Sequence, residues 1–586
     1  MIANNHITKF VAVIVAVAVC LCFCAMGFSD KLVTAAGGTD ISMEYESVLF
    51  NTDEIISVNI LMDGDAWDTM LANATSEEYY QCDVEINGKM FYRVGIRPKG
   101  NTSLISIAND PNTDRFSLKL EFDQFVKGQT CFGLDKLVLN NNFSDATNMK
   151  EALIYDMYQY LGADASLYNF AKISVNNEYW GVYLALEAVE DSFLLRNYGV
   201  ESGELYKPDS MDMDGGMGKG PEGFDALQFG TMAPSDAGFP KSTAKTGTSE
   251  AESDTAPSAE GRPDIADFGM PNISGFSMGG SGANLNYIDD DLDSYSSIWD
   301  SEITRTSKSD HKRVVKALKH ISDGTDLETY MDVDNLLKYM AVHVFSVNED
   351  SLSGNMAHNY YLYEYEGQLN ILPWDYNLTL GGMGKGSDAT STVNDAIDNA
   401  FSGTKFFDTL MENEAYKARY HENLQQLVDE YLNGGGFEAF YTRTRSLIDS
   451  LVKTDPTAFY TYDEYTAAVE TLYEVVKLRG ESIDGQLDGT IPSTASKRRD
   501  SDALVDASHL DLSVMGVMNM GGNMGGSFNF GGGQSKPNTS DSEVAGDETG
   551  KIAAASADKT ASIPLLTAPE SNNDSGSEGT LSLIHI

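Results

Sequence analysis

The segment from Val333 to Asp375, VDNLLKYMAVHVFSVNEDSLSGNMAHNYYLYEYEGQLNILPWD, decides how the chain is expected to fold. Its first part predicts an amphipathic helix, because apolar residues recur there at helical spacing: Val333, Leu336, Leu337, Met340, Ala341 and Val344. A polar loop follows, and two short strands, 360–365 and 369–372, then bracket a turn at Glu366-Gly367. A helix, a polar loop and a hairpin in close succession indicate a mixed fold with a polar site at the loop.

The chain before this segment is predicted to be rich in strands. Residues 51–207 contain one clear helix, 147–161, which ends at Gly162. Strands are predicted at 57–62, 82–86, 89–96, 116–122, 136–139, 168–175 and 182–187, the last two forming a hairpin. Beyond the segment, 406–432 and 437–478 are predicted as long helices. We therefore expect an α+β protein with a strand-rich N-terminal lobe, 39–207, a helical C-terminal lobe, 285–490, and a cleft between them.

Two stretches have the composition of chain that does not fold. Residues 208–284 and 491–586 are dominated by Met, Gly, Ser, Asp and Ala, without apolar periodicity. We expect a disordered insertion and a disordered tail that act as spacers or interaction segments.

The N-terminus predicts export. Phe10 to Phe28, FVAVIVAVAVCLCFCAMGF, has no charged residue and is long enough to cross the roughly 30 Å hydrocarbon layer. Residues 1–38 are therefore either a signal peptide, cleaved near Val33-Thr34-Ala35, or an uncleaved membrane anchor. The protein is expected outside the cell or at its surface.

Charge and cysteine content exclude several classes of protein. The chain has 40 Lys and Arg against 88 Asp and Glu, a net charge of −48, so it repels polyanions and nucleic acid is not expected as a partner. Three of the five cysteines lie in the N-terminal apolar stretch. Cys82 and Cys131 remain, which excludes a disulfide scaffold and leaves material for one optional bridge.

The polar loop carries a pattern of groups that suits phosphoryl transfer. Asp350 is followed by Asn355 at the spacing D-x4-N, and Asp375 comes twenty residues later. In kinases one Asp accepts the hydroxyl proton, while an Asn and a second Asp hold magnesium against the nucleotide phosphates. Carboxylate and amide oxygens suit that hard ion. We therefore expect Asp350 to be the base, and Asn355 and Asp375 to be metal ligands.

Basic groups upstream could bind the phosphates. The loop Arg97-Pro98-Lys99-Gly100-Asn101-Thr102-Ser103 follows a strand and offers backbone N–H groups and positive side chains, although it is not a P-loop. Lys119 lies in the predicted strand FSLKLEF and points to the face opposite Leu118 and Leu120. Its acidic partner is expected to be Glu151 on the following helix, with Glu187 as the alternative.

Several of these motifs together resemble the CotH family, named for spore coat protein H, whose members are atypical secreted protein kinases. The matching stretches, in chain order, are RPKGNTS, LVLNNNFSDATNMKEAL, ISVNNEYWGVYLALEAVEDSFL, ELYKPD and HNYYLYEYEGQLNILPWDYNLTLG. The resemblance implies a kinase-like two-lobed fold and transfer of phosphate from ATP, with Mg²⁺ or Mn²⁺, to Ser or Thr of exported proteins. Carried over by position, it implies Asp350 as the catalytic Asp, Asn355 and Asp375 as metal ligands, and RPKGNTS, with Arg97, Lys99, Gly100, Asn101 and Ser103, as the loop near the nucleotide.

One position departs from the family pattern. The family commonly has Asp-x-Asp after Pro-Trp, and here the second position is Asn377, which would hold a second magnesium less strongly. Asn140, Asn141, Asn142 and Asp145 are interpreted as turn and cap residues, His358-Asn359 as structural and Trp374 as packing.

Three functions are compatible with this pattern. The first is a secreted or surface-tethered kinase, whose own Ser-rich tail offers hydroxyls for autophosphorylation. The alternative is a catalytically weak surface interaction or adhesion protein. A hydrolase with paired carboxylates is disfavoured, because no nucleophile elbow is present.

Overall fold

Seven strands of the N-terminal part close into a β-barrel. The computed structural model describes residues 42–199, 202–208, 282–354, 357–383, 388–399, 401, 403–499 and 501–518. The barrel strands are β1 (Ile56–Leu61), β2 (Tyr80–Ile86), β3 (Lys89–Lys99), β4 (Ser117–Glu121), β5 (Lys136–Asn140), β6 (Tyr168–Val175) and β7 (Glu178–Glu187). Their order is β1-β2-β3-β4-β5-β7-β6, and β6 closes the ring by pairing in parallel with β1, while the other neighbours are antiparallel.

Apolar side chains from alternate residues of each strand fill the barrel interior. Along β1 the buried residues Ile56, Val58 and Ile60 alternate with less buried ones. They share a core with apolar residues of the other strands, among them Val84, Ile96, Leu118, Leu120, Leu137, Leu139 and Ile173. As predicted, Lys119 lies on the face opposite Leu118 and Leu120, which places its side chain outside the barrel.

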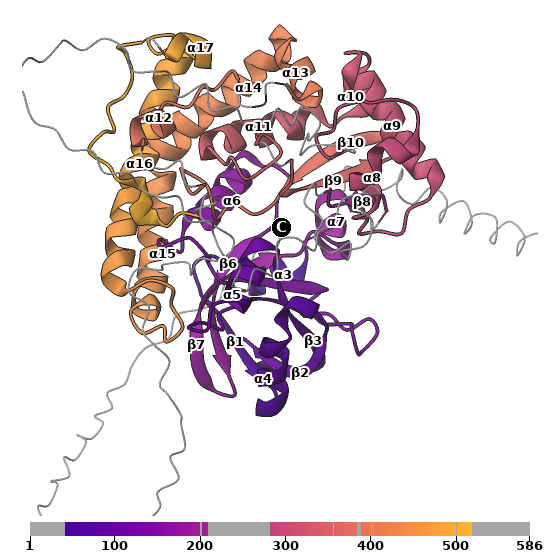
Figure 1. Cartoon of the computed structure of the whole chain (residues 1–586), viewed down its shortest axis with the longest axis vertical. Helices are drawn as coiled ribbons and strands as arrows, with labels where there is room; N and C mark the ends of the chain where they lie inside the picture. The colour runs from indigo at the N-terminus through magenta and orange to yellow at the C-terminus, as the bar shows by residue number, and fades with distance from the viewer. Residues whose placement is uncertain are drawn as a thin grey trace, which may run out of the picture. The chain divides into compact units, whose positions relative to one another are not determined.

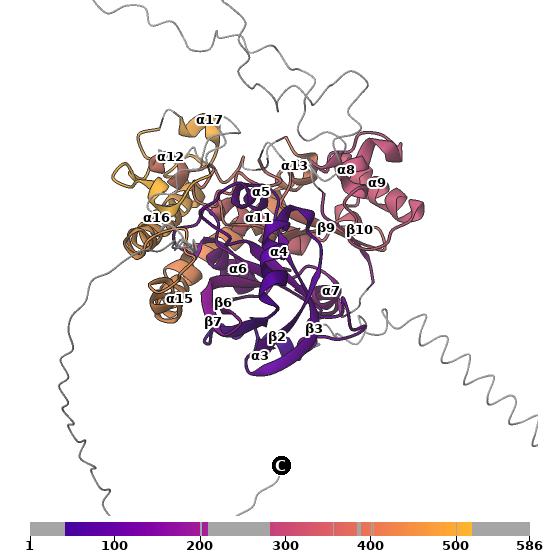
Figure 2. The ribbon, with the colours of Figure 1, turned by 60° about the horizontal axis from the view of Figure 1, so that its bottom comes forward.

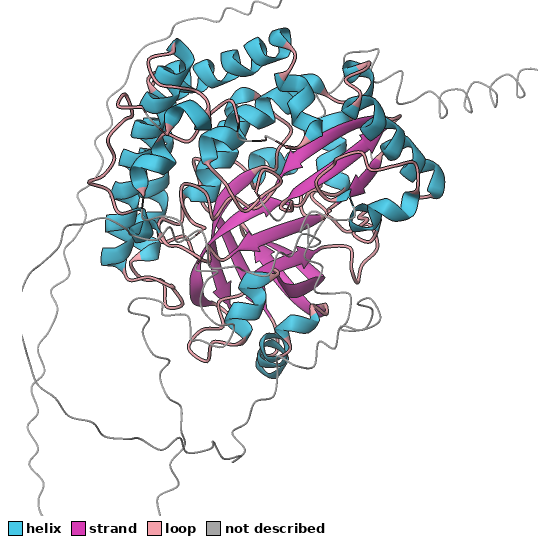
Figure 3. Ribbon diagram, turned by 45° about the horizontal axis from the view of Figure 1, so that its top comes forward, coloured by secondary structure: helices cyan, strands magenta, loops and turns pink. Residues whose placement is uncertain are grey.

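A second, three-stranded sheet packs against helices of the C-terminal part. It has the order β10-β9-β8 and is formed by β8 (Glu204–Tyr206), β9 (Tyr360–Tyr365) and β10 (Gln368–Pro373). Helix α6 (Lys150–Leu161) contacts both β6 and α11 (Val333–Ser346), and so joins the barrel to the helical part. Figures 1 and 2 both show α6 in this intermediate place. Figure 3 shows most helices around the upper and left sides of the strands.

The remaining helices follow in chain order. Short helices precede, connect or follow the barrel strands: α3 (Glu44–Val48), α4 (Gly64–Ala72), η1 (Ala74–Ser76), α5 (Thr102–Ala108) and α7 (Asp191–Tyr198). Further helices follow in the C-terminal part: η5 (Leu292–Tyr295), α8 (Ser296–Trp299), α9 (Lys308–Ser322), α10 (Leu327–Tyr330), α12 (Ala389–Val393), α13 (Lys405–Met411) and α14 (Glu414–Gln426). The last are the π-helix η6 (Leu427–Leu432), α15 (Gly436–Val452), α16 (Tyr462–Asp488), α17 (Ala495–Arg498) and η7 (Leu512–Met515).

The expected kinase-like two-lobed fold is wrong, although the α+β class is confirmed. The N-terminal strands form a closed mixed barrel rather than an open lobe, because β6 returns to pair with β1. Local patterns locate strands but do not specify the partner of a strand distant in sequence.

Both predicted long helices and the start of the tail also differ from expectation. The predicted helix 406–432 is divided between Met411 and Glu414 into α13 and the continuous run of α14 and η6. The predicted helix 437–478 is two helices, α15 and α16, interrupted around Pro456, whose ring and missing N–H do not fit a helix interior. The tail was expected to begin at residue 491, but Ile491, Ala507, Leu512 and Met515 are buried. The chain therefore stays packed to the end of the described segment 501–518.

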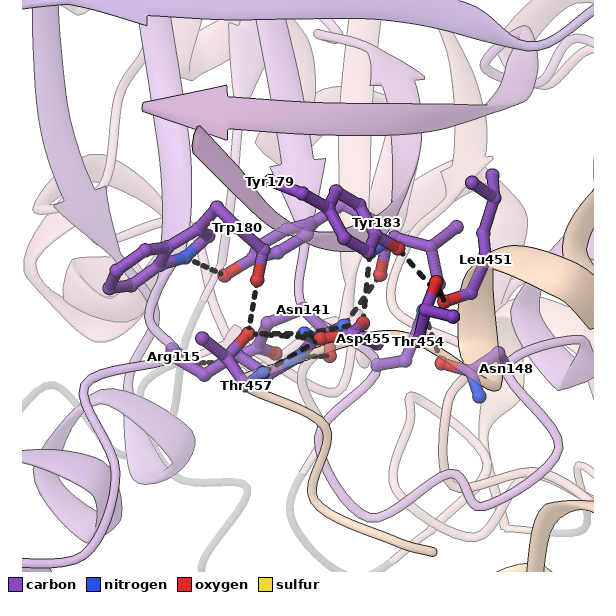
Figure 4. A network of polar contacts seen from close by, with 12 residues as sticks. Arg115, Asn141, Asn148, Tyr179, Trp180, Tyr183, Leu451, Thr454, Asp455 and Thr457 are labelled. Atoms are coloured by element: carbon purple, nitrogen blue, oxygen red, sulfur yellow. Dashed lines mark hydrogen bonds and ion pairs between the residues drawn. The ribbon is translucent and has the colours of Figure 1, made fainter. Parts of the chain in front are cut away.

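A buried polar network fastens the barrel to the α15–α16 connection (Figure 4). The Arg115 guanidinium lies 2.9 Å from the Asp455 carboxylate, and the two side chains are only 2% and 1% exposed. The Arg115 Nη2 also donates to the Val182 carbonyl of β7, whose N–H donates to Asp455. The two buried charges therefore compensate each other, as burial requires.

The outcomes for the N-terminal segment, the insertion and the cysteines complete the comparison with the sequence. The apolar segment 10–28 and most of 208–284 lie outside the described residues. Within the described ranges, no helix is long and apolar enough to span a membrane. Cys82 and Cys131 are buried free cysteines and form no bridge.

Candidate active site

The register of three barrel strands sets out one side of the site. Arg97 on β3 pairs with Lys119 on β4, which pairs in turn with Val138 on β5. Two residues further along β3, Lys99 pairs with Ser117. Because neighbouring strands keep equivalent residues on one face, these side chains form a basic surface on the outside of the barrel.

A cavity of about 260 Å³ opens over this basic surface. All of the predicted site residues except Asn355 border it: Arg97, Lys99, Gly100, Asn101, Ser103, Lys119, Glu151, Asp350 and Asp375. Asn355 lies outside the described residues, so its role stays a prediction. Other parts of its wall include the 140–143 loop, Glu190, Lys207-Pro208, His358-Asn359 and Trp374. Segments that lie far apart in the sequence thus meet at one pocket.

Lys99 is connected to Glu151 by a buried hydrogen-bonded chain. The Nζ of Lys99 donates to Asn140 Oδ1 at 2.9 Å, and Asn140 Nδ2 donates to Glu151 Oε2 at 2.8 Å. Desolvation lowers the pKa of Lys99 to about 8, although the charges of Asp375 and Glu151 oppose this. Burial and the negative charge of Asp375 raise the pKa of Glu151 to about 8. Near neutral pH, Lys99 is therefore charged and Glu151 holds its proton.

Asp375 is a buried acidic residue of the pocket in a left-handed backbone conformation. It lies two residues after the end of β10 and has a positive φ of 62°, which is strained for a residue with a Cβ. Burial raises the pKa of its carboxyl, the nearby Asp350 raises it further, and Lys99 opposes the shift. A cation bound beside Asp375 would stabilise the ionised form of this buried carboxyl.

Asp350 is oriented through both of its carboxylate oxygens. His358 Nε2 lies 2.6 Å from Oδ1, and Asn359 Nδ2 donates to Oδ2 at 3.1 Å. Asn359 also donates to the Asp350 carbonyl at 2.8 Å. The structure therefore assigns His358 and Asn359, interpreted from sequence as structural, a direct place in the site.

A hydrogen bond ties the Asp350 loop to the Asp375 turn. Asn348 Oδ1 accepts from the Asp350 N–H at 3.2 Å, while Asn348 Nδ2 donates to the Asp375 carbonyl at 3.3 Å. The two acidic residues, far apart in sequence, are thereby held in a fixed relation.

Behind them, His343 joins the same two segments. Its Nδ1 lies 2.9 Å from the Tyr376 hydroxyl and its Nε2 2.7 Å from Ser353 Oγ. Burial lowers the pKa of His343 to about 3, so the ring is neutral and each nitrogen serves one side of this link.

Lys119 does not pair with Glu151. Its Nζ donates to Glu190 Oε1 at 2.5 Å, and the other oxygen of Glu190 is bound by Lys136. The alternative partner, Glu187, accepts from Arg196 at 2.6 Å on the other side of β7. Glu190 follows the predicted hairpin by three residues and lies in the matched motif ISVNNEYWGVYLALEAVEDSFL. Its pairing could not be predicted from sequence, because its lysine partners lie on other strands.

Comparison with known proteins identifies the family of the chain. A family model described as CotH kinase protein matches residues 96–483, more than half of the chain. The chain belongs to the CotH kinase protein family. Inner spore coat protein H of Bacillus subtilis (strain 168) is 24% identical to this CotH-family protein over 378 residues, which cover 64% of this chain and 84% of the relative.

The departure at Asn377 has a structural reason in this CotH-family protein. Its Nδ2 donates to the Phe143 carbonyl at 2.8 Å, across the pocket edge. An ionised aspartate could not make this bond, because a carboxylate only accepts. Asn377 therefore holds the 140–143 loop against the Asp375 turn.

The aromatic wall of the CotH site was only partly foreseen. Trp374, interpreted as packing, meets Tyr361 edge-on at 5.4 Å. Lys99 and Lys207 lie over the Trp374 ring at 5.4 and 5.7 Å. Lys207, in the matched motif ELYKPD, is a cation of the pocket that the sequence analysis did not single out.

The residues present fit a magnesium ion only if it keeps several waters. Within the part of the chain that the structure describes, no group of three or more His, Cys, Asp or Glu is placed to hold a metal. Asp375 and Asp350 nevertheless border one cavity and repel each other. Magnesium commonly uses one or two carboxylates together with substrate phosphates, so this donor set suits it.

Proposed function

We propose that this CotH-family protein transfers the γ-phosphoryl group of ATP to Ser or Thr hydroxyls of proteins. One observation carries the proposal: a single cavity joins a basic barrel face with Lys99 to the two carboxylates Asp350 and Asp375. Cations on one side and carboxylates on the other suit a metal-bound polyphosphate, whose charges need both.

The basic face would bind the phosphates. Lys99 is charged near neutral pH, and its ammonium keeps N–H groups beyond the one donated to Asn140. Arg97 and Lys207 border the same cavity. Lys119, in contrast, forms an ion pair with Glu190, so we expect it to stabilise the basic face rather than to bind phosphate.

Asp350 would accept the proton of the attacking hydroxyl. Its carboxylate is oriented by His358 and Asn359, and each oxygen keeps a lone pair for a further hydrogen. As the hydroxyl oxygen bonds to the γ-phosphorus, the bond from that phosphorus to the bridging oxygen breaks. The products are a phosphoester, ADP and a proton on Asp350.

Asp375 would hold the metal ion, with Asn355 as the second proposed ligand. Magnesium or manganese bound here supplies positive charge to the phosphate oxygens. The turn and the bond from Asn348 fix Asp375 at the edge of the cavity in which the phosphates would bind.

Exported proteins are the proposed substrates. The relative from Bacillus subtilis is named an inner spore coat protein. We propose that this chain acts on proteins outside the cell or at its surface, with its own Ser-rich tail as a further acceptor.

The test is a transfer assay on the full chain with γ-labelled ATP, magnesium or manganese and an acidic protein substrate. Asp350→Asn should abolish incorporation and spare nucleotide binding, while Asp375→Asn should weaken both. Glu422→Gln, on the exposed side of α14, is the matched control and should behave as wild type. Nucleotide binding without any transfer by wild type would overturn the kinase proposal and favour a binding protein.

A further inference from the structure

The chain continues into the site after the family match has ended. The match stops at residue 483, yet Leu512 and Met515 are buried and η7 packs on α16. The stretch 512–518, which we call the C-terminal strap, was expected to be part of an unfolded tail. Its packing shows that it belongs to the folded body.

The strap contacts two segments that each carry a site residue. The Ala146 N–H donates to the Met515 carbonyl at 3.0 Å, and Lys150 Nζ donates to the Gly516 carbonyl at 3.4 Å. On its other side, the Met518 N–H donates to the Gly382 carbonyl at 2.8 Å. The first contacts reach the segment that leads into α6 and Glu151, and the last reaches the segment that follows Asp375.

Gly516 makes this close approach feasible. Its φ is +87°, and a Cβ at this position would lie 2.6 Å from the Ser144 carbonyl oxygen and 2.9 Å from the Tyr460 hydroxyl. A side chain here would be strained and would also collide with backbone that cannot rotate away. The docked position of the strap therefore depends on glycine.

Met518 brings the strap to the cavity itself. It packs against a small apolar cluster that includes Leu104 on α5 and Phe143, and it borders the same cavity as Lys99 and Asp375. Helix α5 begins directly after the loop 97–101, so the cluster also supports the basic side of the pocket.

We propose that the C-terminal strap is a positioning element and a wall of the active site. It fixes the Glu151 segment relative to the Asp375 turn, and the Met518 side chain contacts the bound nucleotide or acceptor. The nature of that ligand rests on the proposed function, but the docking of the strap does not.

The first test is Gly516→Val in the full chain, with Gly489→Val as its matched control. Gly489 has nearly the same φ, +83°, but no atom lies within 4 Å of the position that a Cβ would take there, so its substitution brings the strain without the collision. Hydrogen exchange, read by mass spectrometry, should rise in residues 143–150 and 376–383 for Gly516→Val alone. Unchanged exchange in both segments would overturn the positioning role.

The second test distinguishes the contact of Met518 with the ligand from the positioning of the two site segments by the strap. Met518→Ala keeps the strap backbone and should raise the KM for ATP or for the acceptor by about threefold or more, with unchanged exchange. Gly516→Val should lower kcat by about tenfold or more, because the two site segments lose their relation. A Met518→Ala enzyme with wild-type constants would overturn the ligand contact. If no form transfers phosphate, the proposed function fails while the exchange result still decides whether the strap positions the site.

Discussion

Lys119 and Glu190 form a 2.5 Å ion pair on the outer face of the barrel, and this pair leaves Lys99 as the cation coupled to Glu151. The sequence favoured Lys119 for that role because it lies in a regular strand. The register shows that Lys99 lies beside Ser117, two residues further along β3, where the chain through Asn140 begins. We therefore expect the lysine at the loop end to bind phosphate.

Replacement of Lys99 should therefore weaken nucleotide binding more than replacement of Lys119. Lys99→Met removes a charged donor that borders the cavity, and we expect the Kd for magnesium ATP to rise by about tenfold or more. Lys119→Met should alter the Kd less and lower the thermal stability instead, because it leaves Glu190 with Lys136 alone. Calorimetric titration and thermal melts of both variants measure the two effects. A larger loss of affinity in Lys119→Met would reverse the assignment.

The proton on Glu151 should make the stability of the protein depend on pH. Its folded pKa is raised to about 8 from an ordinary value of 4.5, so the folded state binds the proton more tightly than the unfolded state does. The resulting stabilisation is complete below pH 4.5 and is lost as the pH rises through 8. The Gln side chain of Glu151→Gln cannot ionise. Between about pH 5 and 8.5, the free energy of unfolding should therefore fall by at least about 1 kcal/mol more in wild type than in this variant.

Urea unfolding at several pH values measures this difference. The exposed Glu422→Gln serves as the control and should follow the wild-type profile. Parallel profiles for wild type and Glu151→Gln would show that Glu151 ionises normally in the folded protein.

The Arg115–Asp455 pair should be a major source of stability. Arg115→Met would leave a nearly fully buried carboxylate without its counter-ion, at an expected cost of about 3–5 kcal/mol in the free energy of unfolding. Arg445→Met removes an i,i+4 pair with Asp449 on the partly exposed face of α15 and should cost less than about 1 kcal/mol. Denaturant unfolding compares them directly, and equal costs would contradict the role of the buried network.

Asn377→Asp should lose the hydrogen bond that holds the 140–143 loop and should add a negative charge to the pocket. The variant loses the bond to the Phe143 carbonyl and places a second carboxylate near Asp375, so we expect it to be about 1–2 kcal/mol less stable without metal. The same charge should increase the affinity for magnesium or manganese. Thermal melts with and without metal test both changes. Asn377→Ala, which loses the bond but adds no charge, should show only the loss of stability, and a gain in metal affinity by this control would contradict the explanation.

Local patterns predicted much of the secondary structure. The alternation in 57–62 and 116–122 and the helical spacing in 333–344 correspond to β1, β4 and α11. The helix break at Pro456 could have been read from the sequence, because proline interrupts a helix by its own geometry. Barrel closure could not, since the parallel pairing of β1 with β6 depends on which distant edges meet.

The sequence singled out nine residues that the structure brings to one cavity, but it did not predict their pairings. The sequence by itself determined that this is an α+β protein of the CotH family and that Arg97, Lys99, Glu151, Asp350 and Asp375 carry polar chemistry, because residue type and spacing fix what a group can donate, accept or bind. Only the tertiary structure decided that the strands close into a barrel, that Lys119 binds Glu190 and that the segment 512–518 reaches the cavity. These relations join residues tens to hundreds of positions apart, and the free energy that selects them comes from burial and packing of the whole fold.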